Sequence, residues 1–173
     1  PEYDEDTLAF LFKKKNRRVI KYTHPRLENA MELKSVTGGL LVQDVNKVVV
    51  NDKEMKTVTQ RNPTDEEMKD MLFAMKVCKH TKSNSVIYAK DGRTLGIGGG
   101  QPSRVDSSML AVTRAKRFGL SLEGCSVASD AFFPFPDGLL TAAEAGATAV
   151  IQPGGSMNDA DVIKAADDAG LAM

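Results

Sequence analysis

The sequence predicts an α/β fold in which helices cover a mixed sheet. Three observations support this prediction. Strand-like and helix-like segments alternate through the last third of the chain, an Asp91-Gly92 turn joins two apolar runs, and capping residues precede segments of helical periodicity. The chain has 173 residues, of which 42% are hydrophobic, enough for one domain with a buried core. We therefore expect residues 1–173 to form a single domain.

The first third of the chain is expected to hold one helix and three short strands. Asp4–Lys15 has acidic residues in its first turn and lysines in its last, which favours a helix because the helix dipole attracts charges of these signs. Apolar runs at Arg17–Tyr22, Leu40–Gln43 and Lys47–Val50 predict strands. Thr23–Ser35 has no clear period and is expected to be an irregular surface loop.

A capping box marks the start of the next helix. Thr64 and Glu67 follow Pro63 with the spacing that satisfies the first free N–H groups of a helix. The helix presents an apolar face, which we interpret as a core face rather than a ligand surface. This face consists of Met68, Met71, Leu72 and Met75.

A hairpin and a long helix follow. Ser85–Lys90 and Thr94–Ile97 are apolar runs on either side of Asp91-Gly92, a strong hairpin signal. Val105–Phe118 has helical periodicity. These segments extend the predicted sheet and cover it.

The last third alternates strands with helices. Ser126–Ala128 and Ala147–Gln152 are strand candidates, and between them Thr141–Glu144 is expected to start a helix that ends at Gly146. A second helix is predicted at Asn158–Ala169. The last four residues resemble the start of a buried strand, and the chain starts at a proline without a methionine. We therefore expect a part of a longer protein.

Composition argues against several classes of partner. Lysine plus arginine equals aspartate plus glutamate, 23 each, so no net charge favours nucleic acid or a membrane surface. No apolar run approaches the roughly 18 residues of a membrane span. Cys78 and Cys125 lack CxxC spacing, which fits a reducing, cytoplasmic location. His24 and His80 are too sparse for a histidine-built zinc site.

An aromatic loop at Ser129–Gly138 is the most unusual segment. It holds three phenylalanines beside two prolines and two aspartates, so it cannot form the interior of a helix or a central strand. Its rings would suit a flat, polar heterocycle. The alternative is a hydrophobic plug that ties the loop to the core, and the residues of this segment alone favour the plug.

A glycine-rich loop at Gly96–Gly100 leads to Arg104. Such a loop lets the backbone approach a ligand, and an arginine at a helix start suits phosphate or carboxylate. It lacks the further residues of a dinucleotide fingerprint and of a Walker A loop. A ligand cradle and a tight turn remain equal alternatives.

Other candidates lie beside these loops. The loops after Ile97, Ala128 and Gln152 follow strands, where ligands of α/β sheets bind, and we expect them to converge. Asn84 precedes a strand, where its amide either contacts a ligand or caps a turn. Lys79-His80 is more simply a solvated lysine and a loop histidine than an acid/base pair.

Four segments together resemble one known family. Lys82–Val86, Gly96–Arg104, Ser129–Phe135 and Gln152–Ser156 are similar, in order and spacing, to AICAR transformylase. This is the formyltransferase part of a bifunctional purine-biosynthesis enzyme that also carries IMP cyclohydrolase. The resemblance implies transfer of a formyl group from 10-formyltetrahydrofolate to AICAR, which gives FAICAR. It also implies that this chain is the second, cytidine deaminase-like subdomain, with the first subdomain and the cyclohydrolase domain absent.

The resemblance also implies roles for individual residues. The nucleotide would contact Asn84, Arg104 and Phe132. The folate side would consist of Ser103, Val105, Phe133, Pro134, Asp137 and Ser156. Some family members hold a potassium ion, which here would lie near Cys78, Thr81, Ser83, Ser85 and Asp130, mostly through backbone oxygens. The family's active site forms between the subunits of a homodimer.

The family's catalytic lysine–histidine pair belongs to an upstream motif, so the resemblance makes Lys79-His80 a decoy. We therefore expect this chain to bind both substrates but to be inactive alone, with no catalytic residue of its own. The alternative is a stand-alone nucleotide- or folate-binding module without catalysis. A nucleic-acid binder is disfavoured because the chain has no net charge and no basic stripe.

Overall fold

A computed structural model describes residues 2–22, 31–51 and 54–173. The chain divides into two compact units, residues 1–47 and residues 48–173. The assignment of residues 1–173 to one subdomain of a longer enzyme stays a prediction.

The first unit contains a short helix, α1 (Glu5–Phe12). Asp4 caps it: the Thr7 N–H donates to Asp4 Oδ1 at 2.7 Å, and this bond lowers the pKa of the Asp4 carboxyl. The helix ends before the lysines that were expected in its last turn. Arg17–Tyr22, predicted as a strand, is not one. Its apolar run is too short to outweigh the charged residues within it.

A β-hairpin completes this unit. β1 (Met31–Val36) pairs antiparallel with β2 (Gly39–Asp44), and Gly38 at the turn has a φ of 83°, which favours glycine. The prediction of a strand at Leu40–Gln43 is confirmed. The prediction of an irregular loop over Thr23–Ser35 is wrong from residue 31 onward, because the alternating residues of β1 find a partner in β2; residues 23–30 lie outside the described residues.

The second unit is built on a four-stranded mixed sheet, as predicted. Its order is β4 (Arg93–Gly98), β3 (Val86–Lys90), β5 (Cys125–Ser129) and β6 (Ala147–Ile151). β3 is antiparallel to β4 and β5, whereas β5 and β6 are parallel. Asp91 and Gly92 form the predicted hairpin turn, both with positive φ. Lys47–Val50 was expected to be a strand but is irregular.

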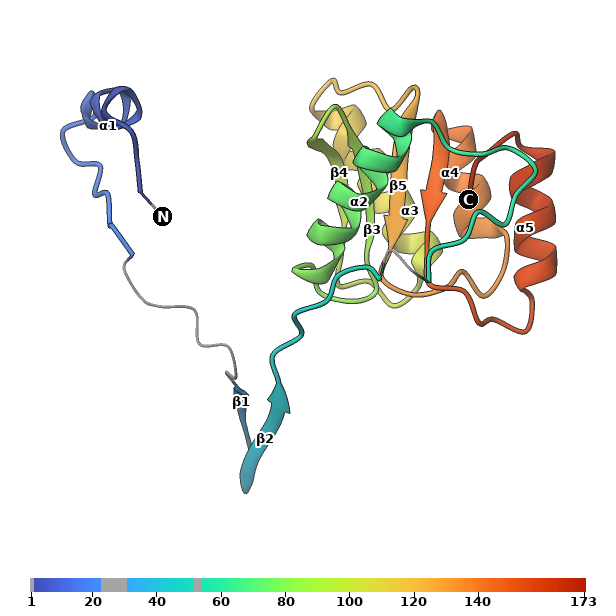
Figure 1. The fold of residues 1–173 in the computed structure, drawn as a ribbon, viewed down its shortest axis with the longest axis horizontal. Helices are drawn as coiled ribbons and strands as arrows, with labels where there is room; N and C mark the ends of the chain where they lie inside the picture. The colour runs from blue at the N-terminus through green and yellow to red at the C-terminus, as the bar shows by residue number, and fades with distance from the viewer. Residues whose placement is uncertain (1, 23–30, 52–53) are drawn as a thin grey trace. The chain divides into compact units, whose positions relative to one another are not determined.

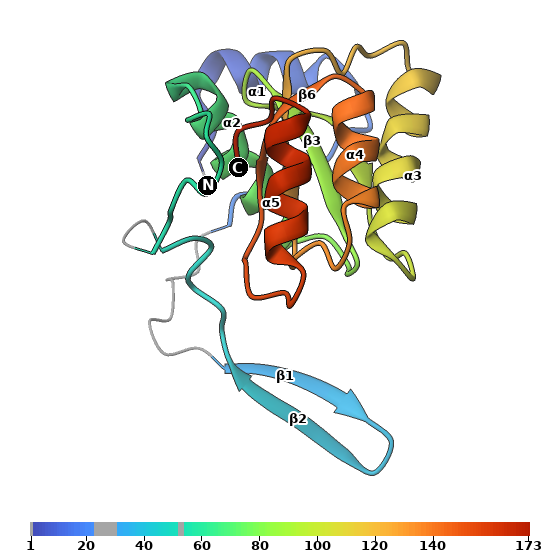
Figure 2. The same cartoon turned by 90° about the vertical axis from the view of Figure 1, so that its right-hand side faces the viewer.

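Helices cover both faces of this sheet. α2 (Asp65–Lys79) lies on one face, and α3 (Arg104–Arg117), α4 (Asp137–Glu144) and α5 (Asp159–Asp168) lie on the other (Figures 1 and 2). The capping box of α2 is confirmed, with both of its hydrogen bonds present. α4 begins at Asp137 rather than at Thr141. The Thr141 hydroxyl donates to the Asp137 carbonyl within the helix instead of capping its start.

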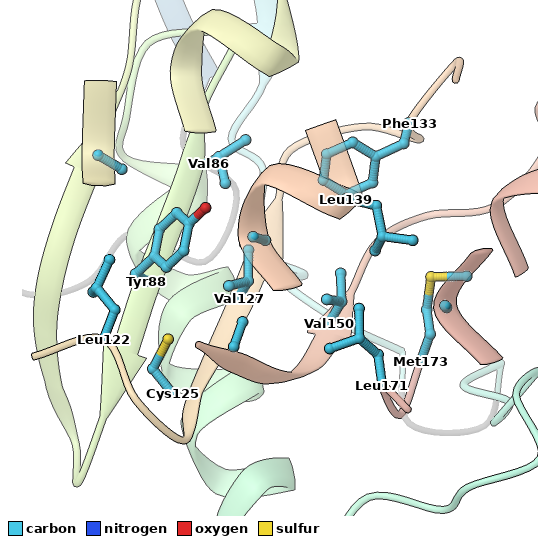
Figure 3. Close-up of a cluster of buried hydrophobic side chains, with 14 of the residues drawn as sticks. Val86, Tyr88, Leu122, Cys125, Val127, Phe133, Leu139, Val150, Leu171 and Met173 are labelled. Carbon is cyan, nitrogen blue, oxygen red and sulfur yellow. The ribbon is translucent and has the colours of Figure 1, made fainter. Parts of the chain in front are cut away.

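Successive side chains of β3 point to opposite faces of the sheet and so belong to two different hydrophobic clusters. Val86 and Tyr88 of β3 point to the layer of α3, α4 and α5, in the large cluster shown in Figure 3. Ile87 and Ala89 of the same strand pack under α2. This is the pattern expected of a strand that is buried on both faces.

Helix α3 lies unusually close to β4, and the glycines permit it. A Cβ built at Gly98 would lie 1.7 Å from the Ser107 carbonyl oxygen, and one at Gly96 would lie 2.6 Å from that of Ala111. These two glycines of the glycine-rich loop are therefore explained by the packing of a helix on a strand, not by a ligand.

Candidate functional site

The predicted convergence of the loops is confirmed. Because β3 is antiparallel to its neighbours, its first residue lies at the same edge of the sheet as the last residues of β4 and β5. Val86 pairs with Gly98 on one side and with Ser129 on the other. The segment before β3 therefore meets the glycine-rich loop and the aromatic loop.

Arg104 is the centre of this edge. Its Nε donates to the Ser129 hydroxyl and to the Ala131 carbonyl, both at 3.2 Å. Nη1 donates to Asn84 Oδ1 at 2.9 Å, and Nη2 donates to Asp130 Oδ1 at 3.3 Å. These bonds use one N–H of each guanidinium nitrogen, and a guanidinium has five N–H donors. Two remain that could bind an anionic ligand.

Asp130 neutralises Arg104 and holds the start of β3. Its Oδ1 accepts the Ser85 N–H at 3.0 Å, and its Oδ2 accepts the Ser83 hydroxyl. The side chains of Arg104 and Asp130 are 16% and 13% exposed, so this ion pair is screened less by solvent than a surface pair. The carboxylate thus fixes both the guanidinium and the backbone before β3.

Asn84 ties the same backbone to the glycine-rich loop. Its Nδ2 donates to the carbonyls of Gln101 and Pro102, both at 3.0 Å, while its Oδ1 accepts from Arg104. The Ser107 hydroxyl donates to the Asn84 carbonyl at 2.9 Å. The amide is thus engaged in holding a turn, which was one of its two predicted roles; contact with a ligand stays a prediction.

The aromatic loop divides its phenylalanines between the two predicted roles. Phe133 is fully buried in the large core cluster, whereas Phe132 is 37% and Phe135 59% exposed. Phe133 is therefore the hydrophobic plug. Its ring cannot form the wall of an open folate site, and only its backbone remains for that predicted role. Phe132 offers a ring face.

Two residues that sequence reasoning did not single out hold this loop. Gln152 Oε1 accepts the Phe133 N–H at 2.6 Å, and Asn158 Nδ2 donates to the Pro134 carbonyl at 2.9 Å. Their positions could have indicated this role, since Gln152 directly follows β6 and Asn158 directly precedes α5, in the loop at the end of the strand.

The other residues predicted for the folate side lie at the starts of helices. Ser103 caps α3, and its hydroxyl accepts the Asp106 N–H at 3.1 Å. Val105 lies near the start of α4, where a Cβ built at Gly138 would be 3.6 Å from its nitrogen. Asp137 is the first residue of α4, and Ser156 precedes α5 and accepts the Asn158 N–H at 3.1 Å. Helix starts favour anionic ligands.

Ser85 carries a buried hydroxyl at this edge, and the predicted potassium site around it stays a prediction. Its hydroxyl is buried and forms no conventional hydrogen bond with a described residue; the polar group beside it is the Cys78 thiol, a weak hydrogen-bond partner. The neighbouring Cys78 thiol donates to the Ala128 carbonyl instead, at 3.4 Å, and burial raises the pKa of this thiol to about 12. The hydroxyls of Thr81 and Ser83 are engaged, by the Val77 carbonyl and by Asp130. No cluster of three or more histidine, cysteine or carboxylate groups suited to a metal occurs in the described part of the chain.

Lys79 and His80 lie at the end of α2, where His80 is the C-cap and its side chain is exposed. Neither side chain forms a hydrogen bond or an ion pair with another described residue. Lys79 is half-buried in the last turn of α2 rather than fully solvated, and the prediction that neither residue is an acid or base in the reaction stays a prediction.

A groove of about 770 Å³ adjoins the site on the α2 side of the sheet. Asp130 and Gln152 line it together with Met68, Met71 and Met75 of α2. Of the predicted apolar face of α2, only Met71 is buried, so this face is partly core and partly groove wall.

Comparison with known proteins identifies the family. Residues 1–114 match the model of the AICARFT/IMPCHase bienzyme family. The chain belongs to this family. It is 52% identical over 173 residues to the bifunctional purine biosynthesis protein PurH of Chlorobium phaeobacteroides (strain BS1), and 54% identical over 175 residues to that of Caulobacter vibrioides. All of this chain is covered in both alignments, but only 33% of each relative, so the chain spans about a third of their length.

A solved structure gives a weaker likeness. It is a diaminohydroxyphosphoribosylaminopyrimidine deaminase/5-amino-6-(5-phosphoribosylamino)uracil reductase from Thermotoga maritima, with a TM-score of 0.43 and 17% identity over 61% of this chain and 35% of that one. This likeness is too slight to bear on fold or chemistry, so the cytidine deaminase-like topology stays a prediction. Within the described residues, no helix is both long enough and apolar enough to span a membrane.

Proposed function

We propose that this chain is the second subdomain of the AICAR transformylase part of the bifunctional enzyme. In this role it supplies binding surface for AICAR and for 10-formyltetrahydrofolate, the co-substrate. The observation that supports the proposal most is the bonded cluster of Asn84, Arg104 and Asp130, which also holds the Ala131 carbonyl directly before the partly exposed Phe132. Cytoplasmic location and a homodimer belong to the same proposal.

The nucleotide would lie against Arg104 and Phe132. The guanidinium suits the anionic part of AICAR, because two of its N–H donors stay available and its charge is only partly solvated. The ring suits the flat heterocycle, since stacking on an aromatic face needs no particular hydrogen bond. Asn84 acts mainly by orienting the guanidinium.

The folate would lie toward the starts of α3, α4 and α5. Ser103, Val105, Asp137 and Ser156 occupy these starts, and Pro134 lies between them on the aromatic loop. Phe133 would take part only through its backbone, because its ring is buried.

A potassium ion would be held by Ser85 and Asp130. The Ser85 hydroxyl and the carboxylate are hard oxygen ligands, which suit an alkali cation. Cys78 would contribute its carbonyl oxygen, because its thiol stays protonated. When bound, the ion would add positive charge beside Arg104 and so favour an anionic ligand.

In the proposed reaction the amine nitrogen of AICAR attacks the formyl carbon. A C–N bond forms, the bond from the formyl carbon to N10 of the folate breaks, and the proton lost by the amine ends on N10. Such a reaction requires close alignment of the two substrates and a proton carrier. The residues of this site align substrates, and we assign none of them the proton transfer.

Titration of the chain with AICAR, followed by calorimetry, tests the proposal. We expect Arg104→Ala and Phe132→Ala each to weaken binding about tenfold or more, which corresponds to the loss of one charge-assisted bond or one stacking contact. Arg117→Ala and Phe118→Ala, changes of the same kind at exposed positions at the other end of α3, should leave the affinity unchanged.

Unchanged affinity in both site variants would contradict the site. Arg104→Ala leaves the Asp130 carboxylate without its ion-pair partner, which lowers stability, so the melting temperature of each variant must be measured. Arg104→Lys provides a further variant that keeps the positive charge but loses the planar set of guanidinium N–H donors. Repeating the titration in sodium in place of potassium tests the ion. Equal affinity and equal melting temperature in the two salts would contradict a specific potassium site.

A further inference from the structure

Two side-chain amides hold the aromatic loop by its main chain. Gln152, directly after β6, accepts the Phe133 N–H at 2.6 Å, and Asn158, directly before α5, donates to the Pro134 carbonyl at 2.9 Å. We call Gln152 and Asn158 the amide clamp. A third anchor is the Phe133 ring, which lies near Leu139 of α4 in the core (Figure 3).

The other side of the loop is fixed separately. The Ala131 carbonyl accepts hydrogen bonds from Arg104 Nε at 3.2 Å and from the Ser129 hydroxyl at 2.7 Å. Phe132 thus lies between two restrained neighbours, Ala131 on the Arg104 side and Phe133 on the clamp side. No hydrogen bond among the described residues restrains the backbone of Phe132 itself.

The ring of Phe132 depends on these restraints. It is 37% exposed, so its own packing does not fix it as the core fixes Phe133. A side chain that is held in its binding orientation before the ligand arrives loses less conformational entropy on binding. The clamp is therefore placed to hold Phe132 in the orientation that it needs beside Arg104.

We propose that Gln152 and Asn158 are positioning residues for Phe132. This proposal rests on the proposed function, because it takes Phe132 to be the face for the AICAR heterocycle. Asn158 makes a further contact: its N–H donates to the Ser156 hydroxyl at 3.1 Å, so one residue joins Pro134 of the aromatic loop to Ser156, both predicted for the folate side.

The test compares two substitutions of Gln152 in the whole chain. Gln152→Met has a similar length but no acceptor for the Phe133 N–H, whereas Gln152→Glu keeps an acceptor oxygen. Two quantities are measured: amide hydrogen exchange at Phe132, Phe133 and Phe135, and AICAR affinity by calorimetry. Lys90→Met is the matched control, since it removes a side-chain bond to the Glu123 carbonyl at the other end of β3.

In Gln152→Met we expect the hydrogen exchange of the Phe133 amide to be about tenfold faster than in the native chain. We expect the variant to bind AICAR about fivefold more weakly. Both changes are consistent with the loss of one hydrogen bond. Gln152→Glu should restore both quantities, and Lys90→Met should change neither. Asn158→Ala removes the second bond alone and serves as the test if Gln152→Met does not fold. Rescue by Gln152→Glu separates positioning from a general loss of stability.

Each other outcome contradicts a different statement. Native exchange at Phe133 in Gln152→Met would show that the amide does not hold the loop, whatever binds there. Faster exchange with unchanged affinity would overturn the positioning of Phe132. Failure of the native chain to bind AICAR would overturn the proposed function and with it the positioning role, while hydrogen exchange would still decide whether the clamp exists.

Discussion

Phe132 and Phe133 are neighbours in the chain but occupy different environments. Phe133 is fully buried against the core, and a Cβ at Gly138 would lie 2.9 Å from its ring. Phe132 and Phe135 remain partly exposed. The plug interpretation of the aromatic loop is therefore confirmed for Phe133, whereas the role of Phe132 as a ligand face stays a prediction.

This division gives a prediction for stability. Phe133→Ala should lower the free energy of unfolding by about 3–5 kcal/mol, because it removes a fully buried ring and leaves a cavity. Phe135→Ala, the same change at an exposed position two residues later, should alter it by less than about 0.5 kcal/mol. Urea denaturation measures both values. Similar losses in the two variants would contradict the assignment of Phe133 as the plug.

The bonds of Arg104 show what a residue-level prediction omits. Its place at a helix start was evident from the sequence, but its four acceptors come from two distant segments: Asn84 and Ser129–Ala131, which includes the Asp130 carboxylate. Gln152 and Asn158 were missed for the same reason. The groups that they bond, the Phe133 N–H and the Pro134 carbonyl, lie about 20 residues away in sequence, and no local sequence pattern predicts contacts over that separation.

A bidentate ion pair holds the start of α2. Arg61 donates from Nη1 and Nη2 to the two carboxylate oxygens of Glu67, both at 2.9 Å, and Arg61 Nε donates to the Gly170 carbonyl at 3.0 Å. Burial alone would raise the pKa of Glu67, but the hydrogen bonds from Arg61 and the other donors at this site outweigh burial and lower it to about 2. The capping box thus also joins α2 to the end of α5.

This lowered pKa predicts the pH dependence of stability. Above about pH 5, Glu67 is ionised in the folded and unfolded states and contributes its full stabilisation, which is lost as the pH falls from about 4.5 toward 2. Glu67→Gln lacks this term. The free energy of unfolding of the native chain should therefore exceed that of the variant at neutral pH, and the excess should shrink by about pH 3.

Urea denaturation at the two pH values measures the excess. Glu66→Gln, the same change at an exposed position of the same helix turn, should have little effect at either pH. An excess for Glu67→Gln that does not depend on pH would contradict the role of the ion pair.

Elements with short-range signals were predicted well. The capping box of α2 and the Asp91-Gly92 hairpin each depend on residues within a few positions of one another. The start of α4 was misplaced because it has no side-chain cap, so the first threonine in its sequence was taken for one. Arg17–Tyr22 and Lys47–Val50 failed because a strand needs a partner strand, and their sequences do not say whether one is near.

At the scale of the whole molecule, the direction of β3 decides where the site lies. Three strand ends and one strand start meet at one edge only because β3 runs antiparallel to β4 and β5. This edge gathers Arg104, Asn84 and Phe132, the residues to which we assign the nucleotide. It does not gather Lys79 and His80 into a bonded pair.

We therefore predict that the purified chain binds AICAR but does not form FAICAR from AICAR and 10-formyltetrahydrofolate. The physical reason is that alignment without a proton carrier leaves the weakly nucleophilic amine unactivated. The assay follows FAICAR formation by the purified chain with both substrates present. Steady turnover by this chain alone would contradict the prediction. If such turnover were then lost on substitution of Lys79 or His80, that pair would be catalytic.

The sequence by itself determined the α/β class, the four strands of the sheet, the start of α2 and the family, because each depends on local periodicity or on motifs in a fixed order. Only the tertiary structure decided which phenylalanine is buried, that Gly96 and Gly98 admit α3, that Asn84 and Asp130 orient Arg104, and that Gln152 and Asn158 hold the aromatic loop. These features depend on contacts between segments far apart in the chain. Such contacts form when strands pair and helices pack, so local patterns do not specify them.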